Sequence, residues 1–141
     1  MKKIILSALL LCGAASAFAQ CDKKVQLTSS KTEYLDASGN LERSDDENSK
    51  VEIWKDSITI APGNAPEAMT GTITSQTCNW TVPFKEGKSV IKAKLSDGNG
   101  ETRNMTLTIE GKDGKVTLLA VLDEAPERQI RVPIDTFAEK G

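Results

Sequence analysis

The chain has 141 residues, with 18 basic and 20 acidic side chains, a formal net charge of −2 and no histidine. This balance, without a clustered Lys/Arg patch, argues against nucleic acid or an anionic membrane as the principal partner. Because histidine is the commonest general base and a common metal ligand, and no catalytic constellation stands out, we expect a non-catalytic protein with no cofactor and no metal.

The first 19 residues have the three parts of a secretory signal: a start with two lysines, a short apolar run (4–11) and a small-residue cleavage site that ends at Ala19. Cleavage there would leave Gln20 at the N-terminus of one domain, residues 20–141, without a membrane span. The short, Lys-led signal is typical of bacteria. We therefore expect a periplasmic or secreted protein whose remaining formal charge is −4, from 16 basic and 20 acidic residues.

Two cysteines, Cys21 and Cys78, remain once the leader is removed. An even pair in an exported chain predicts a disulfide, which would stabilise the fold by roughly 4 kcal/mol in the chain-entropy model. The alternative is a lipid anchor at the outer membrane through Cys21. Against that alternative, Gln20 rather than a small residue precedes the cysteine, and Phe18 stands three places before it.

Short alternating segments fill the N-terminal half of the chain and predict β-strands. They are KVQLT (24–28), KTEYLD (31–36), KVEIWK (50–55), SITIA (57–61), MTGTITS (69–75) and NWTVPF (79–84). Between them, residues 36–50 and 61–68 look like loops, the first with a hairpin around Ser38-Gly39-Asn40. The acidic run Asp45–Glu47 in the first loop is expected to be a solvated surface.

The tryptophans are expected in the core or as barrel plugs rather than as ligand contacts. In NWTVPF the alternation places Trp80, Val82 and Phe84 on one face. Trp54 is the second-to-last residue of the segment KVEIWK.

The region from Ser89 to Ile134 predicts a sequential meander. Its inward positions are expected to be Ile91, Ala93 and Leu95, then Met105, Leu107 and Ile109, and finally Ile130, Val132 and Ile134. The Asp-Gly steps in SDGNGE and GKDGK are strong hairpin signals because such turns need positive φ. Pro133 indicates a sheet edge or the end of a strand.

The segment KVTLLAVLD is apolar on both faces, because Leu119 and Val121 oppose Val116, Leu118, Ala120 and Leu122. We expect a terminal segment of the chain to fold over its outer side.

These patterns together predict an all-β fold, an antiparallel meander of about 8–10 strands. Closure into an up-and-down barrel would remove exposed sheet edges. The alternative is a β-sandwich of immunoglobulin type, but that fold places a Tyr two residues before the second Cys, and Gln76 stands there.

The segments VEIWKDSITIAPG, GTITSQTCNW and MTLTIEGKDGKVTLLAVLDEAPERQIRVPI resemble the small exported lipocalin-like β-barrel proteins of Bacteroidetes-type bacteria. The G-x-W motif of lipocalins is absent from the first strand region, CDKKVQLTSSK. The resemblance implies a barrel that binds a small apolar or amphipathic molecule. The alternative function is a protein–protein interaction module, an inhibitor or a subunit of an envelope complex, for which the doubly apolar segment 115–122 and the acidic loop 36–50 would be the contact surfaces.

Overall fold

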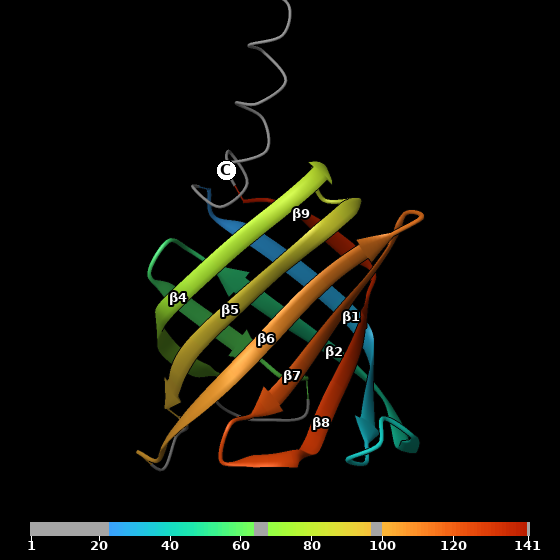
Figure 1. The fold of residues 1–141 in the computed structure, drawn as a ribbon, viewed down its shortest axis with the longest axis vertical. Helices are drawn as coiled ribbons and strands as arrows, with labels where there is room; N and C mark the ends of the chain where they lie inside the picture. Colours follow the sequence, from blue (N-terminus) through green and yellow to red (C-terminus); the bar gives the residue numbers. More distant parts are fainter. Residues whose placement is uncertain (1–22, 64–67, 97–99, 141) are drawn as a thin grey trace, which may run out of the picture.

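The computed structural model describes residues 23–63, 68–96 and 100–140, and over these residues the chain forms strands and turns without a helix (Figure 1). The strands are β1 (Val25–Leu35), β2 (Leu41–Ile53), β3 (Ser57–Ala61), β4 (Met69–Val82), β5 (Glu86–Ser96), β6 (Thr102–Lys112), β7 (Lys115–Leu122), β8 (Ala125–Ile134) and β9 (Thr136–Glu139).

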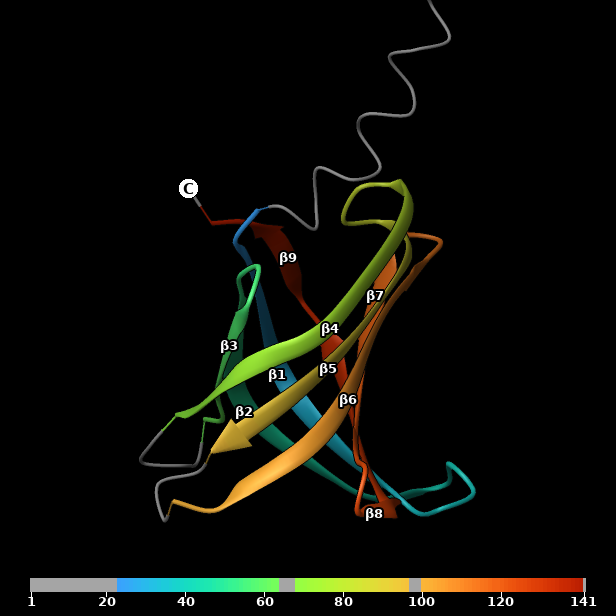
Figure 2. The same cartoon turned by 60° about the vertical axis from the view of Figure 1, so that its left-hand side comes forward.

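The strands close into one barrel. Each strand from β1 to β7 pairs antiparallel with the strand that follows it in the chain. The circle closes because β1 also pairs with β8 through Glu33–Leu35 and with β9 through Val25–Thr28. Figures 1 and 2 show the strands wrapped around a single interior. The predicted antiparallel meander barrel is confirmed, and the alternative β-sandwich is excluded because one sheet closes on itself.

Two of the long strands join segments that the sequence predicted as separate strands. Segments 24–28 and 31–36 form β1, whose pairing with β2 shifts register between Ser29 and Lys31. Segments 69–75 and 79–84 form β4, which shifts register against β5 between Ile73 and Ser75. Such irregularities let a long strand bend around a barrel without losing its inward apolar face.

The hairpin predicted around Ser38-Gly39-Asn40 is confirmed. The Asp36 carboxylate accepts hydrogen bonds from the backbone N–H groups of Ser38 and Asn40, each at 2.9 Å. The Asn40 N–H is the largest cause that lowers the pKa of Asp36 from its ordinary value. The prediction that residues 41–50 form a loop is wrong, because β2 begins at Leu41 and pairs with β1.

The predicted meander from Ser89 to Ile134 is confirmed. Asp113 and Gly114 turn between β6 and β7 with φ of 54° and 80°, as an Asp-Gly hairpin requires. Most of the positions expected to point inward are buried: Ile91, Ala93, Leu95, Met105, Leu107, Ile109 and Val132. Pro133 lies next to the end of β8, where the partner of β1 changes from β8 to β9.

The expected terminal cover over the outer side of β7 is wrong, because β9 pairs with β1 instead. Leu119 lies between Thr108 of β6 and Arg131 of β8 in the pairing register, and Val121 between Thr106 and Gln129. Both side chains are half-buried. Neighbouring outward side chains therefore shield them within the sheet itself.

Candidate functional site

One end of the barrel is filled by aromatic side chains. Trp80 of β4 is 1 % exposed, and its indole Nε1 donates a hydrogen bond to Ser89 Oγ at 2.7 Å. The Phe137 ring meets Trp80 and Phe84 edge-on, with centroid distances of 5.6 and 4.8 Å. We call this the closed end, defined by Trp80, Phe84 and Phe137. It leaves no unused polar group on the tryptophan, whose only donor is bonded.

The Trp80 plug fits because glycines on two neighbouring strands give it room. A Cβ atom built on Gly111 of β6 would lie 2.8 Å from Trp80 Cζ3 and 2.4 Å from the Lys85 carbonyl oxygen. A Cβ atom on Gly87 of β5 would lie 2.4 Å from Trp80 Cα. The prediction that Trp80 is a barrel plug is therefore confirmed. The companion prediction for Val82 is wrong: a register shift between Trp80 and Val82 leaves Val82 41 % exposed.

The opposite part of the interior holds a cavity of about 120 Å³. Its apolar wall draws on β2, β3, β4, β6, β7 and β8, with Val51, Ile60, Met69, Leu107, Leu118 and Val132 among its side chains. Its polar wall consists of Thr32 and Tyr34 of β1 with Glu47 and Ser49 of β2. We call this the open end. It is apolar on most sides and polar along two adjacent strands.

The polar wall comes from the acidic stretch for which the sequence predicted a solvated loop. In β2 the side chains of Asp45, Glu47 and Ser49 are half-buried and those between them are exposed. They share a strand face with the core residues Val51 and Ile53, because alternate residues of a strand point the same way. The prediction of a fully solvated acidic surface is therefore wrong for Asp45 and Glu47. Extending the alternation of VEI backward along the sequence would have found them.

Charged groups at the open end are mostly paired with one another. The Arg43 guanidinium lies 4.1 Å from the centroid of the Tyr34 ring and 3.3 Å from an Asp45 carboxylate oxygen. The pair Arg131–Glu33, at 2.8 Å, joins β8 to β1. Arg43 and Asp45 together carry no net charge, so Glu47 is the polar-wall residue that adds a negative charge to the cavity.

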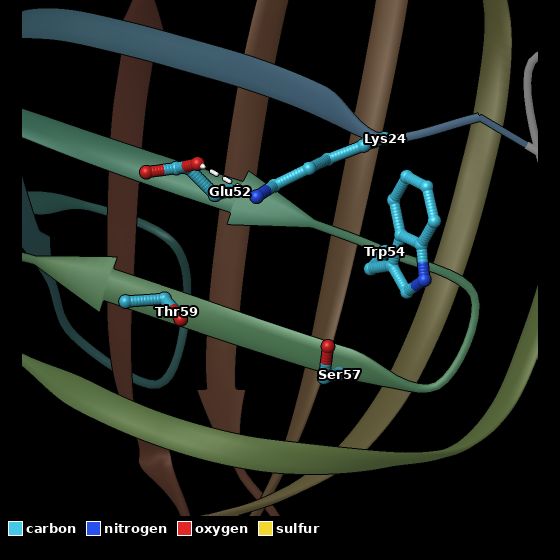
Figure 3. Close-up of a pocket in the computed structure, with 5 residues that line it drawn as sticks. All are labelled: Lys24, Glu52, Trp54, Ser57 and Thr59. Atoms are coloured by element: carbon cyan, nitrogen blue, oxygen red, sulfur yellow. Dashed lines mark ion pairs between the residues drawn. The ribbon is translucent and has the colours of Figure 1, made fainter. Parts of the chain in front are cut away.

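A second hollow, of about 400 Å³, lies on the outside of the barrel over β2 and β3. Figure 3 shows Lys24, Glu52, Trp54, Ser57 and Thr59 around it. Trp54 is 44 % exposed, so the prediction that this tryptophan is a core residue is wrong. Alternation again gives the reason: Trp54 follows the inward Ile53 and must point out.

The two charged residues that line the outer hollow, Lys24 and Glu52, are held in ion pairs. Glu52 pairs with Lys140 Nζ at 2.7 Å and with Lys24 Nζ at 3.5 Å, and Figure 3 marks the Lys24 pair. The pKa of the Glu52 carboxyl lies below its ordinary value, and the hydrogen bond from Lys140 is the largest cause. This cluster joins both ends of the folded chain to β2, which is a structural role.

Cys78 of β4 is half-buried against the core, and its Sγ accepts a hydrogen bond from Ser89 Oγ at 3.4 Å. Its predicted partner Cys21 and the predicted cleavage site at Ala19 and Gln20 lie outside the described residues, so the disulfide, signal peptide and lipid-anchor alternatives stay predictions. Within the described ranges, no group of three or more His, Cys, Asp or Glu side chains could hold a metal ion. In the same ranges, no helix is long and apolar enough to span a membrane.

No protein-family model matches this chain, and comparison with curated proteins and with solved structures gave no significant match.

Proposed function

We propose that this protein binds a small molecule whose apolar part occupies the cavity at the open end. The observation that supports the proposal is the asymmetry of the interior: aromatic rings fill one end, whereas a cavity of about 120 Å³ with a mainly apolar wall interrupts the core at the other. Interiors are normally packed with few voids larger than a water molecule. A cavity lowers the stability of the empty protein. A ligand that fills it restores the missing contacts and so stabilises the folded state.

The same proposal includes export to the periplasm or the outside of a bacterial cell and a non-catalytic role. The sequence features of the leader and the missing histidine support these points. The alternative of an interaction module has less support, because Leu119 and Val121 are half-buried between the outward residues of β6 and β8. The acidic stretch 41–50 is likewise part of a paired strand.

The proposal is tested with neutral apolar probes, toluene and 1-hexanol, added to the ¹⁵N-labelled protein. We expect shifts of backbone amide signals around Met105, Leu118 and Ile130, which line the cavity, and little change around Trp80. The Ala120→Leu variant fills the cavity and should abolish the shifts. The matched control is Leu119→Ala, on the opposite face of the same strand, which should keep them. Absence of shifts in the wild-type protein, or shifts that persist in Ala120→Leu, would overturn the proposal.

A further inference from the structure

The hydrogen-bonding groups of the polar wall are unused. Among the described residues, the side chains of Thr32, Glu47 and Ser49 make no hydrogen bond or ion pair, and the Tyr34 hydroxyl makes no hydrogen bond. By contrast, the inward Ser29 hydroxyl nearby lies within hydrogen-bond distance of the carbonyl oxygens of Lys31 and Pro133. Thr32 is buried and the other three residues are half-buried, and all four line the same cavity, so together they form a candidate binding surface.

Thr32 gives the sharpest indication. The residue is only 6 % exposed, yet its hydroxyl has no side-chain or backbone partner among the described residues. No fully sealed side-chain nitrogen or oxygen lacks a partner in this part of the chain, so the Thr32 hydroxyl opens into the cavity that it lines. The hydroxyl is therefore available to form a hydrogen bond with a polar group of a ligand in the cavity.

The negative charge of Glu47 determines which polar group of a ligand would bind best at this wall. Glu47 is half-buried and has no cation within ion-pairing distance in the described residues, while Arg43 is committed to Asp45 and the Tyr34 ring. A partly desolvated carboxylate is stabilised by a cation and destabilised by a second anion. An ammonium group has three N–H donors and no acceptor, which suits a wall of one carboxylate and three hydroxyl groups.

Size limits the apolar part of the ligand. The cavity of about 120 Å³ is somewhat smaller than the dry cavity of about 150 Å³ that is known to hold benzene. It is also well below the roughly 300 Å³ at which pockets for drug-sized ligands begin. The apolar part of the ligand is therefore limited to about one small ring or a short alkyl chain, and a long lipid chain does not fit.

We propose that the open end binds a small organic ammonium compound, with one ring or a short alkyl chain against the apolar wall and the ammonium group at Glu47, Thr32 and Ser49. This inference rests on the proposed function, since it assigns a ligand class to the same cavity. It adds a preference that an apolar cavity alone would not have: a cationic head group over a neutral or anionic one on the same chain.

The test compares n-hexylamine, 1-hexanol and hexanoate by calorimetric or NMR titration at pH 7. We expect hexylamine to bind at least about tenfold more tightly than 1-hexanol, and hexanoate to bind most weakly. In Glu47→Gln the affinity for hexylamine should fall to that for 1-hexanol, which should itself be unchanged. The matched control Asp46→Asn removes an adjacent carboxylate that is exposed on the outer face of β2 and should leave all three affinities unchanged.

The outcomes separate the two proposals. Equal binding of hexylamine and 1-hexanol, tighter binding of hexanoate, or an equal loss for both probes in Glu47→Gln would overturn the ammonium preference and leave the cavity-binding proposal standing. Hexylamine binding that survives in Ala120→Leu would be surface binding and would overturn both. Circular dichroism and thermal unfolding of each variant establish that the barrel is folded before titration. Ser49→Ala, which removes one hydroxyl, is a second test of the same wall. We expect it to lower the affinity for hexylamine only, and by less than Glu47→Gln does.

Discussion

The two ends of this barrel are built from the same alternating strands, but aromatic rings fill the interior at one end and a cavity remains at the other. At the closed end, large rings pack edge-on and glycines on β5 and β6 make room for Trp80. At the open end, smaller aliphatic side chains leave a cavity, and the residues on β1 and β2 become polar toward the mouth. The closed end buries more side-chain contact. The open end has fewer contacts, an empty volume and hydrogen-bonding groups without partners among the described residues. Under the proposed function, the closed end stabilises the barrel and the open end binds the ligand.

Replacing the plug should have the largest effect on stability. Trp80→Ala removes a 1 %-exposed ring and should lower the free energy of unfolding by about 3–5 kcal/mol, measured by urea denaturation followed by far-UV circular dichroism. The matched control is Trp54→Ala, which removes a 44 %-exposed indole and should cost less than about 1 kcal/mol. Equal losses in the two variants would show that the closed end is not the stabilising end.

The predicted disulfide should also act at the closed end, because Cys78 contacts Ser89, the hydrogen-bond partner of Trp80. We expect the exported protein to begin at Gln20 and to take up a thiol-alkylating reagent only after reduction, as intact mass measurements would show. Reduction should then cost about 2–4 kcal/mol of unfolding free energy. A mass that begins at an acylated Cys21 would instead establish the lipid-anchored alternative.

One substitution made at two places compares packing density directly. Ala93 is 3 % exposed and does not line the cavity, whereas Ala120 is 6 % exposed and does. Ala93→Val should overpack the core and cost about 1–3 kcal/mol. Ala120→Val extends into free space and should cost far less or stabilise the protein. A similar cost for both variants, in parallel denaturant titrations, would mean that the cavity cannot accept added atoms.

The ion cluster on the outer surface should have the smallest effect. Its hydrogen bond and charges lower the pKa of Glu52 below the ordinary value, so the cluster stabilises the folded state above the ordinary pKa and the stabilisation is lost as the pH falls through the folded pKa. Glu52→Gln should therefore cost less than about 1 kcal/mol at pH 7 and nothing measurable near pH 3. Thermal unfolding at both pH values tests this, and a difference that persists at the lower pH would contradict the assignment.

Part of the candidate site was predictable from the sequence. The spacing of Val51 and Ile53 with Ser49 and Glu47 already places all four on one strand face, so alternation carried further back indicates an acidic group near the core. The spacing does not predict which residues of other strands lie next to Glu47. Thr32 lies on a different strand, and it shares the inward face only because β1 shifts register between Ser29 and Lys31.

The sequence by itself determined the all-β class, the consecutive hairpins and most inward residues from Ile91 to Val132, because alternation and Asp-Gly turns act between residues close along the chain. The tertiary structure decided that β1 closes the barrel against β8 and β9, that glycines on β5 and β6 make room for Trp80, and that one end stays hollow. These outcomes depend on backbone hydrogen bonds between distant strands, which form in the same way whatever the side chains. They depend also on how well the volumes of side chains from many strands add up to fill one interior.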